Sequence, residues 1–218
     1  MKRSRTPLVI AIVLVVAAGV AIAAVLATRG GDDEDSASTV PPPAAGTGSV
    51  PGAGETTVTV EGAALPPLED PANDAAVGTP APALRGTDYG GNAVDITPGT
   101  GGPMMIVFLA HWCPHCNNEI PVLLEWRDSG QIPADLQVFG VSTAADPERP
   151  NYPPDQWLAE KEWDWPVLAD DAELTAANAY GVTGFPFFTI VDADGNVAAR
   201  GSGEYPIEAL QVLVDSVA

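Results

Sequence analysis

Apolar and polar residues alternate along the second half of the chain in blocks that predict both strands and helices. Met104–Leu109 is an unbroken apolar run, which is typical of a strand buried on both faces. Leu136–Val141 predicts a second buried strand, and Val167–Leu168 a short third one. Helices are expected to begin at the cysteines (with Ile120, Leu123 and Leu124 on the inner face), around Asp155–Glu162, and over Ala172–Tyr180.

The last part of the chain has a different pattern. Phe187–Val191 and Val197–Arg200 are separated by the turn-forming segment Asp192–Asn196, which predicts an antiparallel hairpin. Ile207–Val217 predicts a closing amphipathic helix. Strands that alternate with helices and finish in a hairpin indicate an α/β domain, in which helices cover both faces of a central mixed sheet.

The amino-terminal pattern predicts a membrane anchor. After a basic start, the uncharged run from Leu8 to Ala27 is long enough to cross a bilayer core of roughly 30 Å as a helix. Because acidic residues follow Arg29, we expect a single-pass protein of the cell membrane, with its amino terminus in the cytoplasm and the remainder outside. The alternative is a cleaved signal peptide and a secreted protein.

Composition divides the chain into three parts. Residues 1–29 are the basic start and the predicted transmembrane anchor. Residues 30–76 are rich in Gly, Ala, Pro, Ser, Thr and Asp, and such a segment buries too little apolar surface to offset the entropy of ordering. We therefore expect a disordered linker there, followed by one folded domain over residues 77–218.

The charge of the chain excludes two kinds of partner. The formal net charge is −20, and all of the acidic residues lie beyond Arg29. Such a field repels nucleic acid and anionic lipid headgroups. The membrane is therefore expected to be contacted through the amino-terminal helix alone.

The candidate chemistry lies in one short segment, because both cysteines and both histidines occur between His111 and Cys116. Two cysteines separated by two residues cannot cross-link distant loops, and this spacing indicates thiol–disulfide exchange. Cys113 begins the predicted helix, where free N–H groups and the helix dipole stabilise an anion, so it is the expected thiolate nucleophile. Cys116, one turn deeper, is expected to resolve the mixed disulfide. His111 lies either at an exposed rim or close enough to a thiol to affect it.

Several separated motifs resemble the thioredoxin superfamily, and in particular its membrane-tethered TlpA-like branch of thiol–disulfide oxidoreductases. The resemblance spans most of residues 77–218. It rests on the segment preceding the branch's additional amino-terminal hairpin, on the strand that runs into the active site, on a proline within the first helix, and on the segment of the family's cis-proline. These are Gly78–Leu84, Ile106–Cys116, Pro121 and Gly184–Asp192.

The resemblance implies a thioredoxin-like fold and roles for several residues. Trp112 would offer a flat apolar contact surface beside the cysteines; a partly buried packing residue is the alternative. The Phe185 backbone, before a cis Pro186, would pair with an extended substrate strand. Glu119 would exchange a proton with the buried thiol; a first-turn glutamate favoured by the helix dipole is the alternative. Cytoplasmic thioredoxins place their buried acid six residues before the first cysteine, where this chain has Val107.

His115, between the cysteines, bears on the direction of exchange. An imidazole that donates a hydrogen bond or positive charge to Cys113 stabilises the reduced form and makes the disulfide more oxidising. The Pro114–His115 pair also resembles the dipeptide of strongly oxidising periplasmic disulfide donors. We therefore expect oxidation of exported protein thiols, with a membrane or extracytoplasmic redox partner resetting the cysteines. A solvent-facing His115 without such a role is the alternative.

Other functions fit less well. The TlpA-like architecture implies the alternative of a reductase for specific client cysteines, such as those of an apocytochrome c. A copper metallochaperone would use the two thiolates and an imidazole, but that family has a wider cysteine spacing and a distant histidine. Haem attachment needs a histidine where Asn117 stands, and peroxiredoxins need Thr or Ser at the position of Ala110. No cofactor and no metal is expected beyond the redox-active Cys113–Cys116 disulfide.

Overall fold

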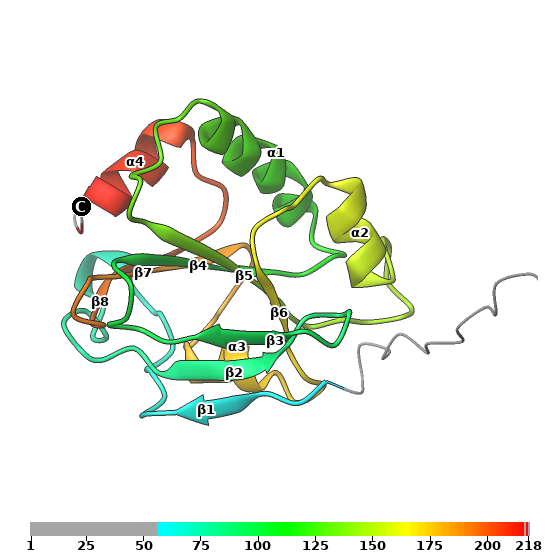
Figure 1. The fold of residues 1–218 in the computed structure, drawn as a ribbon, viewed down its shortest axis with the longest axis horizontal. Coiled ribbons are helices and arrows are strands. Elements are labelled where there is room, and N and C mark those ends of the chain that lie inside the picture. The colour runs from blue at the N-terminus through cyan, green and yellow to red at the C-terminus, as the bar shows by residue number, and fades with distance from the viewer. Residues whose placement is uncertain (1–55, 216, 218) are drawn as a thin grey trace, which may run out of the picture. The chain divides into compact units, whose positions relative to one another are not determined.

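The computed structural model describes residues 56–215 and residue 217. They contain a three-stranded sheet of order β1-β2-β3 and a five-stranded sheet of order β6-β5-β4-β7-β8, as Figure 1 shows. The elements in chain order are β1 (Thr59–Glu61), the 3-10 helix η1 (Pro71–Asn73), β2 (Ala83–Thr87), β3 (Ala93–Ile96), β4 (Met104–Leu109), α1 (Pro114–Asp128), β5 (Gln137–Ser142), α2 (Pro154–Glu160), β6 (Val167–Ala169), α3 (Thr175–Ala179), β7 (Phe187–Val191), β8 (Val197–Ser202) and α4 (Ile207–Asp215).

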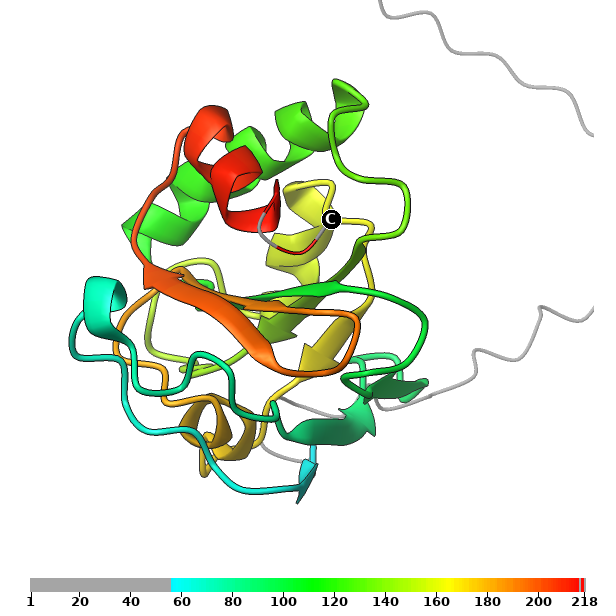
Figure 2. The ribbon, with the colours of Figure 1, turned by 90° about the vertical axis from the view of Figure 1, so that its left-hand side faces the viewer.

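The five-stranded sheet is mixed, as the sequence predicts. Its central strand β4 runs parallel to β5, which pairs in parallel with β6, and antiparallel to β7, which forms the hairpin with β8. All residues of β4 are buried because both faces of the strand are covered. Figures 1 and 2 show α1, α2 and α4 on one face and α3 with the smaller sheet on the other. The predicted α/β fold, with helices on both faces of a central mixed sheet, is therefore confirmed for the described residues.

Alternate residues of β4 serve two separate hydrophobic clusters, because successive side chains of a strand point to opposite faces. Met105, Val107 and Leu109 pack in the cluster that includes the inner face of α1. Their neighbours Met104, Ile106 and Phe108 pack in the other cluster, with β2, β3 and α3. Both faces of β4 are thus packed against hydrophobic side chains along its whole length, up to the residues that precede the cysteines.

Helix α1 starts immediately after Cys113 and contains Pro121 in its interior. Its inner face buries Ile120 and Leu123 as expected, whereas Leu124 is only half-buried. Trp126, which the periodicity did not single out, is fully buried on the same face. Its Nε1 donates a hydrogen bond to Gln211 of α4 at 3.1 Å, which joins the two helices on this side of the sheet.

The predicted boundary between linker and domain at residue 77 is wrong. Strand β1 pairs antiparallel with β2, so the hairpin β2–β3 has a third strand that precedes it in the chain. Leu65, Leu68 and Ala76 are buried, although the segment around them is rich in Pro, Ala and Gly. These residues pack into the domain singly, without the regular spacing of a helix or a strand. Composition alone therefore predicts a linker in this segment.

A buried ion pair also fixes this segment to the domain. Asp74, just after η1, accepts two hydrogen bonds from the guanidinium of Arg200 in β8, and both side chains are almost entirely excluded from solvent. Arg200 also donates to the carbonyls of Pro66 and Tyr180, at 2.9 and 2.8 Å. A buried guanidinium needs such partners, because an unpaired charge in the interior is costly. The folded domain therefore includes residues 56–76.

The predicted transmembrane anchor and residues 30–55 of the predicted linker lie outside the described residues. Within residues 56–215 and 217, none of the helices has the length and apolar character needed to cross a bilayer.

Candidate active site

The two cysteines lie at the point where β4 ends and α1 begins. Cys113 is the N-cap residue of α1, with extended backbone angles and no side-chain cap on the helix end. Pro114 occupies the first turn, where its missing N–H costs no hydrogen bond. Uncapped N–H groups of a helix start favour a negative charge, which is the arrangement expected for a nucleophilic sulfur.

Both cysteines are free, so the structure represents the dithiol form. Cys113 keeps 6% of its surface exposed and Cys116 none. The Cys113 thiol donates a hydrogen bond to the carbonyl of Phe185 at 3.4 Å. Burial raises the pKa of the Cys116 thiol well above its usual range, and negative charge at Cys113 and Glu119 adds to the increase. Cys116 is thus held protonated beneath Cys113, as the assignment of a resolving cysteine requires.

Glu119 lies on the buried face of α1, one turn after Cys116, and is only 1% exposed. Burial raises its pKa to about 7; a hydrogen bond from the Tyr205 N–H opposes the rise, and the charge of Glu204 adds to it. The Tyr205 N–H donates to Oε2 at 3.0 Å, whereas Oε1 has no hydrogen-bond partner among the described residues. A carboxyl group that is half-ionised near neutral pH, with one free oxygen, can accept and return a proton.

His115 lies on the exposed side of the motif. Its Nδ1 donates a hydrogen bond to Oε1 of Glu204 at 2.6 Å, across the start of α1. The same carboxylate oxygen accepts a second hydrogen bond from Asn118 Nδ2 at 3.1 Å. Nδ1 of His115 therefore points to the Glu204 carboxylate. The sequence analysis predicts instead that the imidazole acts on the sulfur of Cys113.

His111 is fully buried, so the exposed-rim alternative for it is wrong. The backbone N–H of Asp146 donates to Nε2 at 3.1 Å, so Nε2 accepts and Nδ1 carries the proton that it donates to the Pro150 carbonyl at 2.7 Å. Burial lowers the pKa of His111, which agrees with a neutral ring. This imidazole holds the loop between β5 and α2.

The residues predicted to contact a substrate come together beside Cys113. Trp112 packs edge-to-face on Phe185, with ring centroids 6.0 Å apart, and its Nε1 donates to the Ala144 carbonyl at 2.7 Å. The Phe185–Pro186 peptide bond is cis, as the resemblance implied. The guanidinium of Arg149 lies 4.2 Å from the centre of the Trp112 ring. These side chains form one face around the N-cap sulfur.

Three residues near the cysteines were not identified from the sequence. Glu204 and Tyr205 follow β8 and reach α1 from more than eighty positions away. Asn117, which follows Cys116 directly, donates to the carbonyls of His111 and Cys113 at 3.2 and 2.9 Å and accepts from Trp157 Nε1 at 3.0 Å. No local pattern marks Glu204 or Tyr205, because their contacts arise only when the chain folds.

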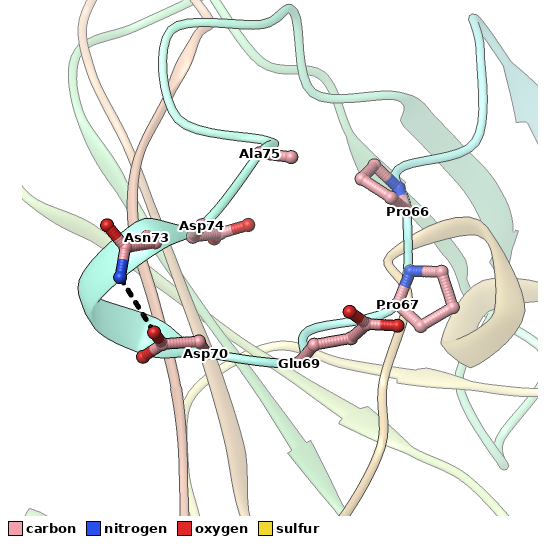
Figure 3. A pocket seen from close by; sticks show the side chains of 7 residues that line it. All are labelled: Pro66, Pro67, Glu69, Asp70, Asn73, Asp74 and Ala75. Carbon is pink, nitrogen blue, oxygen red and sulfur yellow. Dashed lines mark hydrogen bonds between the residues drawn. The ribbon is translucent and has the colours of Figure 1, made fainter.

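A surface hollow of about 400 Å³ lies away from this motif, around η1. Figure 3 shows its lining, which includes Pro66, Glu69 and Asp70 and contains neither cysteine. The Asp70 carboxylate accepts a hydrogen bond from Asn73 Nδ2 at 2.8 Å, and Asp74 is paired with Arg200. Two of the three acids that line the hollow are thus paired, Asp70 within it and Asp74 with Arg200 outside it. Among the described residues, no three or more His, Cys, Asp or Glu side chains are grouped so as to hold a metal ion.

Comparison with known proteins assigns this arrangement to a family. The Redoxin family matches residues 76–213, which is more than half of the chain. The chain belongs to the Redoxin family. The matched region contains the cysteines, Glu119, the cis-proline segment and Glu204, and the predicted resemblance to the thioredoxin superfamily and its TlpA-like branch is confirmed.

Two curated relatives are similar in sequence to about half of this chain. Nucleoredoxin from Mus musculus is 28% identical over 112 residues, or 50% of this chain and 25% of that protein. The thiol:disulfide interchange protein DsbE homolog from Paracoccus denitrificans is 33% identical over 102 residues, or 47% of this chain and 51% of that protein. The chain thus spans between a quarter and about half of the length of these curated relatives.

Two solved structures superpose on the Redoxin domain. The first is a thiol:disulfide interchange protein of the thioredoxin family from Chlorobium tepidum TLS. It is 26% identical with a TM-score of 0.53, over 66% of this chain and 99% of that one. The thioredoxin domain of a thiol-disulfide oxidoreductase from Bacteroides vulgatus is 25% identical with the same TM-score of 0.53, also over 66% of this chain and 99% of that one.

Proposed function

We propose that this Redoxin protein is a thiol–disulfide oxidoreductase that exchanges its Cys113–Cys116 pair with cysteines of protein clients outside the cytoplasm. The observation that carries the proposal is the buried Cys116 thiol next to Glu119, whose pKa of about 7 suits proton transfer near neutral pH. Cys113 at the uncapped start of α1 supplies the attacking sulfur. The names of the relatives, which include thiol:disulfide interchange proteins, support the same chemistry.

In the reducing direction, the Cys113 thiolate attacks a client disulfide, and one client sulfur leaves as a thiolate that takes up a proton from solvent. Cys113 is then joined to the other client sulfur in a mixed disulfide. Cys116 passes its proton to the Glu119 carboxylate and attacks the Cys113 sulfur. The second client sulfur leaves as a thiolate and is protonated. The client has gained two electrons, and the Cys113–Cys116 disulfide has formed. Oxidation of a client dithiol is the same sequence in reverse.

The direction we propose is reduction of client disulfides. The expectation of an oxidant rested on an imidazole acting on the Cys113 sulfur, and the Nδ1 of His115 is instead bonded to Glu204. A carboxylate beside the imidazole offsets the positive charge that would stabilise the reduced form. The TlpA-like architecture supports reduction as well. Disulfide donation remains the second candidate, supported by the Pro114–His115 pair between the cysteines.

Location outside the cytoplasm, with residues 1–29 as the anchor, is also part of the proposal. Its support is the basic start and the uncharged run from Leu8 to Ala27. A single anchor would keep the Redoxin domain close to the membrane, where exported proteins emerge and where a membrane redox partner can reset the cysteines. Client proteins and that partner would bind at the face formed by Trp112 and Phe185 and would present their own cysteines there.

The test is an equilibration of the full chain with glutathione buffers, followed by alkylation of free thiols to count the reduced fraction. A reduction potential near that of thioredoxin, about −270 mV, supports a reductase, whereas one near about −120 mV supports a disulfide donor. The Cys116→Ser variant should accumulate a mixed disulfide at Cys113 with a disulfide-containing peptide. Cys113→Ser should form none. A wild-type chain that exchanges with neither glutathione nor the peptide would refute the proposed function.

A further inference from the structure

Two consecutive residues after β8 bind the first turns of α1 at three points. Glu204 Oε1 accepts hydrogen bonds from His115 and Asn118, at 2.6 and 3.1 Å. The next residue, Tyr205, donates its backbone N–H to Glu119 at 3.0 Å. One short segment thus contacts the exposed histidine between the cysteines and the buried acid behind them. The hydrogen bond from His115, followed by that from Asn118, lowers the pKa of Glu204, which therefore carries its charge at neutral pH.

We propose that Glu204 is a positioning residue that sets the redox poise of the cysteine pair, by holding the His115 imidazole to itself and away from the Cys113 sulfur. The inference rests on the proposed thiol–disulfide exchange, and it assigns the control of that exchange to a residue outside the Cys-x-x-Cys motif.

The physical basis is competition for one imidazole. A histidine placed against the nucleophilic sulfur stabilises the thiolate and with it the reduced form of the pair, which makes the disulfide a stronger oxidant. Glu204 engages Nδ1 of this ring, so the imidazole is directed toward a carboxylate. The carboxylate also offsets the charge of a protonated ring. Both effects of Glu204 favour the disulfide over the dithiol and keep the reduction potential low.

The expected size of the effect is modest, because the side chains of His115 and Glu204 are 66% and 42% exposed. Exposed charge pairs are weakened by solvent, and measured pairs of this kind correspond to a factor of about two to five in an equilibrium constant. For a two-electron couple, such a factor is a shift on the order of 10 to 20 mV. Equilibria with glutathione resolve a change of this size when variants are measured side by side.

The chain offers variants that separate geometry from charge. Glu204→Gln removes the charge and keeps the Oε1 acceptor that both His115 and Asn118 use, whereas Glu204→Ala releases both donors. Glu208→Gln is the matched control, because Glu208 is an exposed acid in the first turn of α4, four residues away. His115→Ala, alone and combined with Glu204→Ala, shows whether the effect passes through the imidazole.

In glutathione equilibria of the full chain, we expect Glu204→Ala to shift the dithiol–disulfide equilibrium about two- to fivefold toward the dithiol. Glu204→Gln should shift it less, and Glu208→Gln should leave it at the wild-type value. In the His115→Ala background, the effect of Glu204→Ala should largely disappear. The inference is overturned if Glu204→Ala has the wild-type equilibrium, or if its shift is the same with and without His115. A wild-type chain that fails to exchange at all refutes the proposed function instead, and the two failures are distinguishable.

Discussion

Replacing Glu119 by glutamine should make the protein more stable and less active at neutral pH. Glu119 is buried, one carboxylate oxygen has no hydrogen-bond partner among the described residues, and burial raises its pKa from the ordinary 4.5 to about 7. The folded protein therefore binds this proton more tightly than the unfolded chain does. Between about pH 4.5 and 7 the native state holds a proton that the unfolded state has released, so the contribution of Glu119 to stability is lost as the pH rises through this range.

The difference between 4.5 and about 7 corresponds to roughly 3 kcal/mol at pH 8. Glutamine is uncharged, has nearly the same shape, and keeps an oxygen that can accept the hydrogen bond from the Tyr205 N–H. We therefore expect the free energy of unfolding of Glu119→Gln to exceed that of the wild type by about 2–3 kcal/mol at pH 8. Near pH 4 the two proteins should differ little.

The assay is urea denaturation of both proteins in the dithiol form, at a series of pH values between 4 and 8.5. The difference between the two proteins is the informative quantity, because it cancels other groups that titrate in both. One of these is Asp170, whose pKa is also raised by burial. A difference that stays constant over the whole pH range would contradict the assignment of a raised pKa to Glu119.

The same variant should slow the closing step of the exchange. General acid–base catalysis is typically worth a factor of 10² to 10⁴, and we expect Glu119→Gln to form the Cys113–Cys116 disulfide from a mixed disulfide about 100-fold more slowly at pH 7. Rapid quenching with an alkylating agent after mixing with a disulfide peptide measures this step. An unchanged rate would mean that the Cys116 proton leaves by another route.

Two further predictions concern the amino-terminal boundary of the domain and the location of the protein. A fragment that begins at residue 77 should fail to fold stably, because it loses the buried Leu65 and Leu68 and leaves Arg200 without Asp74. Breaking the buried pair alone should cost about 3–5 kcal/mol of stability. Circular dichroism should show a native fold for a fragment from residue 56, and equal melting temperatures of the two fragments would contradict the corrected boundary. In intact cells with the protein held reduced, a thiol reagent that cannot cross the membrane should label Cys113 of the full chain, because this sulfur keeps some exposure. Labelling only after lysis would contradict the location outside the cytoplasm.

The strands around the active site were predictable because their burial is continuous. Met104–Leu109 has the same limits in the sequence pattern and in the structure, since an uninterrupted apolar run has one stable environment, between two covered faces. The hairpin of β7 and β8 was predictable from its turn residues. The short helix α3 begins at Thr175 rather than at Ala172, because the preceding residues form a turn that ends with Leu174 in a left-handed conformation.

Residues 56–76 and the residues that surround the motif depend on contacts between distant positions. Leu65 and Leu68 each insert into the domain without a repeating neighbour, so no periodicity identifies them. His111 could not be assigned from its neighbours either, because its partners are backbone groups of Asp146 and Pro150 in a loop between β5 and α2. The role predicted for Glu119 rested on resemblance, and only the fold shows that its environment is closed by Tyr205.

The burial that raises the pKa of Glu119, and thereby destabilises the fold at neutral pH, also orders the steps of the proposed reaction. In the dithiol, burial holds the pKa of Cys116 high, and negative charge at Cys113 raises it further. Attack by Cys113 on a client disulfide converts that sulfur into a neutral mixed disulfide and removes its contribution to the pKa of Cys116. Proton transfer from Cys116 to Glu119 thereby becomes easier at the moment when the resolving thiolate is needed, and not before. If water surrounded the resolving thiol, it would screen the charge of Cys113, and the pKa of that thiol would depend little on the state of Cys113. The buried carboxyl group of Glu119 and the buried thiol of Cys116 therefore act together. Formation of the mixed disulfide at Cys113 makes it easier for Cys116 to lose its proton and attack.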